Sequence, residues 1–313
     1  MLGAATRRLS LGVRLTGAEE RRTGLPLPPA PPDPYDYPFH EFLVMELERG
    51  RLDALLLPDR LHGQGPAFEA TTLLAAFAGA TDRIGLVATA ATGPGRADGL
   101  ARRLASLDAV SAGRAGWQPA GADAATGECV DAAHRLWDAA NTGLPGAPPA
   151  LPQGRPVLFH PAGTSGERSL AARHADVVLA GRHPLDDARA LNTLIKAEAA
   201  GHGRLPDDLL VWAGLTPLVV GRPLPGGARS DGGVLTGTAA QIADHIERHH
   251  ARAACDGFVL TFPALPGPLV DFVDQVVPEL WRRGLFPNDY AHPTLRANLG
   301  LPSCPVPLGA VHA

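Results

Sequence analysis

Short, unbroken hydrophobic runs alternate with longer amphipathic segments along most of the 313 residues. The runs lack an alternation of polar and apolar residues, which is typical of parallel strands buried on both faces. They predict strands at Leu9–Leu15, Leu52–Leu57, Ile84–Ala90, Arg114–Trp117, Pro156–Phe159, Asp176–Ala180, Leu209–Leu215 and Gly257–Phe262. The longer segments predict helices at His40–Arg49, Phe68–Ala80, Gly99–Ser111, Glu128–Ala139, Gly166–His174, Leu185–Ala200, Ala239–Arg252 and Leu269–Arg283.

Eight strand–helix units in succession favour a closed (β/α)8 barrel over an open doubly wound sheet. We expect a single barrel domain over residues 1–313. Its irregular parts are predicted to be a Pro-rich loop at 25–37, two short loops at 141–153 and 221–234, and a C-terminal tail at 290–313 that wraps or frays. In such a barrel the ligand site lies at the carboxyl ends of the strands.

Composition and charge narrow the class of protein. A net charge of −4 without a long basic run disfavours nucleic-acid binding, which needs clustered Lys and Arg. The cysteines Cys129, Cys255 and Cys304 are odd in number and far apart, so we expect free thiols in a reducing cytoplasm. No apolar run reaches transmembrane length, and the run after Arg7 and Arg8 is too short for a signal peptide. We therefore expect a cytoplasmic protein that binds neither membrane nor nucleic acid.

The strand ends carry few groups suited to common barrel chemistries. Asp59 and His62 follow the second predicted strand, and His160 follows the fifth. One acid at the mouth does not provide the carboxylate pair of a glycosidase, and no spacing matches a metal-ligand motif. Lys196 is the only lysine, and it falls on a predicted outer helix, which excludes Schiff-base catalysis at a strand. His160 is left as the candidate general acid or base, with a packed or solvated histidine as the alternative. We expect no metal.

A loop after the fifth strand is the best candidate for binding an anion. It contains Gly163, Thr164 and Ser165 and opens the next helix. Free amide groups and the helix dipole at such a position favour a phosphate. The alternative is an ordinary capped turn with Thr164 or Ser165 as the N-cap, and the local sequence leaves both interpretations open.

Several segments resemble the luciferase-like flavin-dependent monooxygenases, in the branch that contains nitrilotriacetate monooxygenase. These segments are Thr81–Thr92, Leu100–Asp108, Ser111–Trp117, Leu235–Ile246, and Asp256–Leu260 with Asp271–Phe286. The resemblance implies that reduced FMN, supplied by a separate flavin reductase, serves to oxidise a small organic metabolite. It also implies a homo- or heterodimer. Carried over by position, Asp59 and Thr92 approach the flavin ring, and Gly163, Thr164 and Ser165 hold its phosphate.

The chain departs from this family pattern at positions that contact flavin. After the third strand the family has a Ser-Thr-Thr-Tyr run, where this chain has Ala91-Thr-Gly-Pro. The Asn that follows Trp117 in the family is Gln118 here, and Pro161 replaces a glutamine before the phosphate loop. The insertions that cover the site are also short. We therefore expect weak FMN binding. Two alternatives stay open, a non-catalytic subunit that partners a full-length homologue and a barrel used for flavin-independent chemistry.

Overall fold

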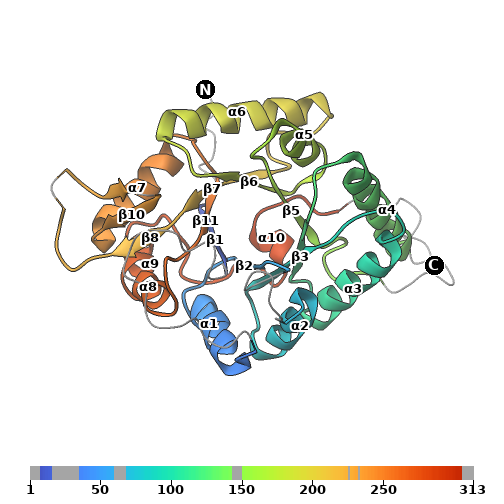
Figure 1. Ribbon diagram of the computed structural model, residues 1–313, viewed down its shortest axis with the longest axis horizontal. Helices are drawn as coiled ribbons and strands as arrows, with labels where there is room; N and C mark the ends of the chain where they lie inside the picture. Colours follow the sequence, from blue (N-terminus) through green and yellow to red (C-terminus); the bar gives the residue numbers. More distant parts are fainter. Residues whose placement is uncertain are drawn as a thin grey trace.

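The barrel predicted from the sequence is confirmed. The computed structural model describes residues 8–15, 35–59, 68–142, 150–224, 226–231 and 233–304. Its parallel strands close in the order β1-β11-β7-β6-β5-β4-β3-β2, and Figure 1 shows them end-on at the centre of the molecule. The strands are β1 (Ser10–Arg14), β2 (Ala54–Leu57), β3 (Gly85–Ala90), β4 (Ala115–Pro119), β5 (Val157–Pro161), β6 (Val177–Gly181), β7 (Leu210–Leu215) and β11 (Gly257–Leu260).

Helices surround the strands, as Figure 1 shows. Asp36 and Pro38 explain why the first helix begins at Tyr37 rather than at His40. The Asp36 carboxylate accepts the Phe39 amide at 3.1 Å, and Pro38 needs no hydrogen-bond partner in the first turn. The helices before β11 are α1 (Tyr37–Arg49), α2 (Ala70–Ala80), α3 (Ala97–Val110), α4 (Ala124–Ala140), α5 (Ser165–His174), α6 (Leu185–Gly201) and α7 (Ala239–Ala251).

The helix predicted at Leu269–Arg283 is interrupted. It consists of α8 (Gly267–Asp271), a π-helical turn at Phe272–Val276, and α9 (Val277–Arg282). Pro278 lies in the first turn of α9 and has no amide to donate to the preceding turn, so the regular α-helical ladder is broken there.

The prediction of an irregular loop at 221–234 is partly wrong, because these residues include strand β9 (Arg229–Asp231) and the start of strand β10 (Val234–Gly237). Together with β8 (Pro217–Val219), these strands form a small second sheet. β10 pairs with β8 in parallel and with β9 in antiparallel orientation, beside β7 in Figure 1. These strands are only three or four residues long, which is too short for a clear hydrophobic period in the sequence.

The inside of the barrel is a packed hydrophobic core. The side chains of each strand alternate between the lumen and the helices, so one residue in two faces inward. Trp212 and Phe159 meet there with ring centroids 5.6 Å apart. A Cβ at Gly12 would lie 2.4 Å from the Trp212 ring, so glycine allows this close contact. The core contains Ala54, Leu56, Val87, Val157, Phe159, Val177, Leu179, Leu210, Trp212, Val259, Leu295, Leu299 and Leu301.

The tail wraps rather than frays over the residues that the structure describes, which reach 304. Its short helix α10 (Leu295–Asn298) and Leu299 add apolar side chains to the barrel core. Arg296 binds the half-buried carboxylate of Asp176 through both terminal nitrogens, at 2.9 and 2.7 Å. The tail thus closes the amino end of the barrel. Residues 143–149, and most of the Pro-rich loop at 25–37, lie outside the described residues.

Asp108 on α3 is a buried carboxyl at this closed end. One oxygen accepts from the Gln153 amide and from the Ala115 backbone at 3.3 Å, and the other has no partner among the described residues. Burial raises its pKa to about 6. The folded state therefore holds this proton more tightly than the unfolded chain, whose Asp pKa is about 3.9. The resulting stabilisation is complete below about pH 4 and is lost as the pH rises through about 6.

We expect the change Asp108→Asn to be tolerated better at pH 7 than at pH 4. Its effect on the free energy of unfolding should be about 1–3 kcal/mol more favourable at pH 7, because the amide carries no charge to bury. Urea unfolding across this pH range measures the difference. Asp98→Asn, at an exposed position on the same helix, is the control and should show no such trend. An equal effect of Asp108→Asn at both pH values would contradict the account.

Candidate functional site

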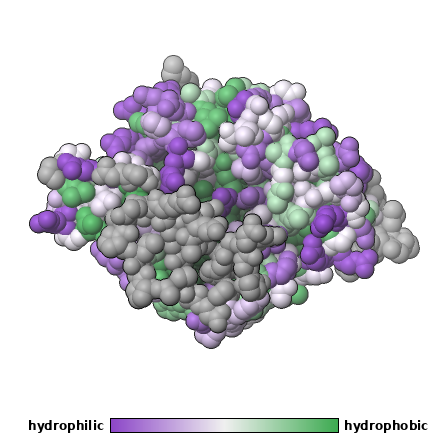
Figure 2. All heavy atoms as spheres, viewed as in Figure 1, coloured by the Kyte–Doolittle hydropathy of each residue, from purple (hydrophilic) through white to green (hydrophobic). Residues whose placement is uncertain are grey.

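The predicted site residues follow the carboxyl ends of their strands. Asp59 follows β2, Thr92 follows β3, and Thr164 and Ser165 follow β5. They therefore lie at one end of the barrel, which in this fold is the end that binds ligands. Figure 2, in the orientation of Figure 1, shows a hollow near the centre of one face, between hydrophilic side chains over α6 and over α3 and α4. This end is called the mouth below.

Polar side chains form the floor of the mouth, directly above the hydrophobic core. Arg14 lies two residues beyond Gly12 on β1, and Gln118 lies two beyond Gly116 on β4, so both face the lumen. The Arg14 guanidinium donates to the Gln118 side-chain oxygen at 2.9 Å, from one side of the barrel to the other. Sequence reasoning missed Arg14. Its position two residues after an inward glycine was the signal that could have identified it.

A second polar cluster lies on the wall of the mouth at β6, β7 and β11. Arg182 follows β6 and runs over Gly214, where a Cβ would come within 3.0 Å of the arginine Cγ. Its guanidinium donates to the Thr216 hydroxyl and, at 3.2 Å, to the Gly233 carbonyl. The Thr216 and Thr261 hydroxyls are 2.6 Å apart. The sequence gave no sign of Arg182, which lies just after β6.

His160 does not face the mouth. The predicted strand ended at Phe159, but β5 continues to Pro161, so His160 is a strand residue that points away from the lumen. It is fully buried, with Nδ1 2.7 Å from the Pro161 carbonyl and Nε2 3.0 Å from the Gly121 carbonyl. This placement does not support His160 as a general acid or base. It supports a histidine that fixes the loop after β4.

Thr92 and Asp59 have different surroundings. The Thr92 hydroxyl is 3.1 Å from that of Thr126, which also bonds the Asp123 carboxylate that caps α4. Gly121 packs over this pair, since a Cβ there would lie 2.4 Å from the Thr126 hydroxyl. Asp59 is exposed at the mouth. The structure therefore joins Thr92 to the His160 cluster through Gly121 but not to Asp59.

The loop at the start of α5 is a capped helix end, as the alternative interpretation predicted. Thr164 is the N-cap, and its hydroxyl accepts the Glu167 amide at 3.2 Å. In return, the Glu167 carboxylate accepts the Thr164 amide at 2.8 Å, which completes a capping box. A Cβ on Gly163 would lie 3.3 Å from this carboxylate. A negative charge therefore already lies beside the loop.

The loop is nevertheless suited to a phosphate. Gly163, Thr164, Ser165 and Gly166 are all exposed, and the amides of Ser165 and Gly166 open the helix without an intrahelical acceptor. Together with two hydroxyls and the helix dipole, these donors suit the phosphate of FMN. One group opposes phosphate binding, because a bound phosphate and the Glu167 carboxylate repel each other.

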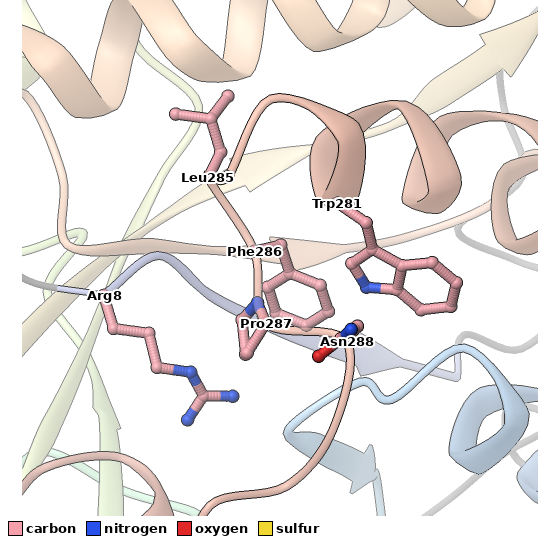
Figure 3. Close-up of a pocket in the computed structure, with 7 residues that line it drawn as sticks. Arg8, Trp281, Leu285, Phe286, Pro287 and Asn288 are labelled. Carbon is pink, nitrogen blue, oxygen red and sulfur yellow. The ribbon is translucent and has the colours of Figure 1, made fainter.

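Two further pockets lie at the opposite end of the barrel. One, of about 420 Å³, is lined by Arg8, Trp281 and Phe286 and is drawn in Figure 3. The Arg8 guanidinium lies 5.9 Å from the centroid of the Phe286 ring. The other, of about 210 Å³, includes Asp176 and Arg296. Arg8 and Asp176 precede their strands, so neither pocket belongs to the mouth.

Metal sites and membrane spans are both missing from the described part of the chain. It holds no group of three or more His, Cys, Asp or Glu side chains arranged to bind a metal ion. None of its helices combines the length and the apolar composition needed to cross a membrane.

Comparison with known proteins defines the class. The family model described as "Luciferase-like monooxygenase" matches residues 29–118. One component of the pristinamycin IIA synthase of Streptomyces pristinaespiralis is 31% identical, over 85% of this chain and 89% of that protein. The nitrilotriacetate monooxygenase of Aminobacter aminovorans is 27% identical in its matching component, over 85% of this chain and 90% of that protein. The chain belongs to the luciferase-like monooxygenase family, and it is an enzyme of the monooxygenase class.

Solved structures agree on the fold. EDTA monooxygenase from Chelativorans sp. BNC1 superposes with a TM-score of 0.80 at 24% identity, covering 96% of this chain and all of that one. A riboflavin lyase, determined with modified FMN and riboflavin, gives a TM-score of 0.78 at 20% identity, covering 95% and 97% of the two chains.

Proposed function

We propose that this chain is the oxygenating component of a flavin-dependent monooxygenase that acts on a small organic metabolite. Reduced FMN binds at the mouth and comes from a separate flavin reductase. The observation that carries the proposal is the exposed, donor-rich start of α5 at the carboxyl end of β5. Family membership supports it. The names of the relatives include nitrilotriacetate, an alkane and a sulfone, so they do not select one substrate.

The proposed roles follow from position. Gly163, Thr164 and Ser165 hold the phosphate, and Asp59 and Thr92 lie toward the ring. The Arg14–Gln118 pair forms the polar floor beneath it. Flavin, when bound, supplies the redox chemistry, and the protein binds and orients the reactants and limits access of water. His160 keeps the loop after β4 in place and takes no proton-transfer step in this account. The chain works as a homo- or heterodimer.

Turnover with a reductase tests the function. The purified chain, FMN, NADH and a flavin reductase are incubated in air with a panel of metabolites, and products that have gained one oxygen atom are detected by mass spectrometry. We expect product only when flavin and reductase are both present. Turnover that persists without flavin would support the flavin-independent barrel instead.

A non-catalytic subunit is the second candidate, and the Glu167 carboxylate beside the phosphate loop favours it. A second component of pristinamycin IIA synthase is also 38% identical to 30% of this chain, so two different components of one enzyme resemble it. Activity that occurs only after mixing with a full-length homologue would establish this candidate. Full activity of the isolated chain would exclude it.

Removing the negative charge of Glu167 should strengthen the binding of FMN through its phosphate. Glu167→Gln keeps the capping box, because Gln serves at the same position, but removes the charge. We expect FMN to bind about tenfold more tightly, which corresponds to about 1.4 kcal/mol, while the affinity for riboflavin stays the same. Fluorescence titration with both flavins measures the ratio. Glu128→Gln, exposed on α4, removes the same charge elsewhere and should have no effect. An unchanged ratio in Glu167→Gln would place the phosphate elsewhere.

A further inference from the structure

A cationic side chain, that of Arg182, lies on the wall of the mouth. Among the described residues, Arg182 makes no ion pair, and its bonds go to the Thr216 hydroxyl and the Gly233 carbonyl. Arg14, on the floor, is a second cation that faces the lumen. None of the described lumen-facing positions at the strand ends is acidic. These positions are Arg14, Pro58, Thr89, Gln118, Pro161, Thr216 and Thr261. The surroundings of Arg182 therefore favour an anion.

Arg182, Thr216 and Thr261 form a chain of hydrogen bonds. Arginine only donates hydrogen bonds, so the Thr216 oxygen accepts from the Arg182 N–H. The Thr216 hydroxyl can then donate a hydrogen bond to the Thr261 oxygen, 2.6 Å away. This orientation leaves the Thr261 O–H as a donor at the end of the chain. Arg182 is exposed, and its bonds to described residues use only one of its terminal nitrogens. A guanidinium with open donors, beside a hydroxyl, matches the two oxygens of a carboxylate.

The cluster is separate from the loop proposed to hold the flavin phosphate. That loop follows β5, whereas the Arg182 guanidinium reaches Thr216 beyond β7, on the side of β11. Neighbouring strands are about 4.8 Å apart, so the two places are roughly 10 Å apart around the mouth.

We propose that Arg182, Thr216 and Thr261 form a carboxylate-binding subsite, and that the substrate is a carboxylate-bearing metabolite. This inference rests on the proposed function for its use in turnover, because it names the substrate class of the same mouth. The subsite itself is a property of these three residues and requires no flavin.

Calorimetric titration of the whole chain tests the subsite. The probes are acetate, succinate and tricarballylate, with the trimethyl ester of tricarballylate as an uncharged control, each with and without FMN. We expect at least one carboxylate to bind and the ester not to bind. Arg182→Gln should lower the affinity for that carboxylate at least tenfold, and Thr261→Val should lower it severalfold. Arg189→Gln, which removes an arginine from the outer face of α6, is the matched control and should change nothing.

Other results would overturn the inference. It fails if no carboxylate binds, or if Arg182→Gln binds it as well as the unaltered chain does. The affinities for FMN and riboflavin separate the two possible anions. If Arg182→Gln lowers affinity for FMN but not for riboflavin or the carboxylates, the anion is the flavin phosphate and the proposal is wrong. Carboxylate binding that depends on Arg182 in a chain that binds no flavin would keep the subsite and reject the proposed function.

Discussion

Arg114→Met is expected to lower the free energy of unfolding by about 3–5 kcal/mol, the largest effect of any change considered for this chain. Arg114 precedes β4 at the closed end of the barrel and is 3% exposed. Its guanidinium donates to the carbonyls of Ser111, Ile84, Ala78 and Thr81, and to the Thr81 hydroxyl, over 2.7–3.1 Å. Methionine fills much of the volume but leaves all of these buried acceptors without a donor, and each unpaired group costs about 1–3 kcal/mol.

Chemical denaturation of the purified variants measures this loss. Arg102→Met is the matched control, because Arg102 lies on α3 with its side chain 81% exposed, and its one ion pair within the described part of the chain is a long one with Asp98. We expect it to change stability by less than about 0.5 kcal/mol. A loss below about 1 kcal/mol for Arg114→Met would show that the hydrogen bonds of this arginine contribute little to the barrel.

Ser165→Asp is expected to weaken FMN binding by about 30-fold, or about 2 kcal/mol. The new carboxylate would lie at the first position of α5, where the phosphate is proposed to bind, and two like charges about 4 Å apart repel each other even in a solvated site. An acid in the first turn suits the helix dipole, so the fold should not be destabilised. Affinity and stability are thereby expected to change in opposite directions.

Two variants separate this repulsion from other effects. Ser165→Ala removes only the hydroxyl and should weaken FMN binding by a few fold, as expected for one hydrogen bond. Ser169→Asp adds the same charge one turn further along α5, at an exposed position, and should have a much smaller effect. Fluorescence titration with FMN and riboflavin measures all three variants. Equal affinity for FMN in Ser165→Asp and the unaltered chain would mean that this loop does not hold the phosphate.

The sequence predicted the barrel because its signal is repeated eight times. A buried parallel strand is a continuous apolar run, and each such run was found within a few residues of its actual ends. What failed was local. The strands β8, β9 and β10 are too short to show a period, and the π-helical turn before Pro278 depends on one missing amide.

The candidate site was less predictable, because a place after a strand does not give the direction of a side chain. His160 was nominated as a residue of the mouth, on the expectation that the strand ends at Phe159. Strand β5 instead includes His160 and Pro161, and the alternation of side chains along it points His160 away from the lumen. Arg14 was missed because an arginine inside a barrel is recognised only once the inward positions are known. Arg182 was missed because only the fold brings this residue, which follows β6, to Thr216. An N-cap at Thr164 or Ser165 was one of the two interpretations left open, but the Glu167 carboxylate beside the phosphate loop was not foreseen.

The central claim is that FMN binds at the start of α5, and titration of the purified chain with FMN, oxidised and then reduced without oxygen, tests it most directly. We predict saturable binding with a Kd in the micromolar range, because several flavin contacts of the family are replaced by Ala, Gly or Pro and each lost hydrogen bond costs about 0.5–1.5 kcal/mol. We also predict that binding is weakened by Ser165→Asp and strengthened by Glu167→Gln. The absence of saturable binding of either form up to about 1 mM, where the binding free energy is only about −4 kcal/mol, would contradict the account.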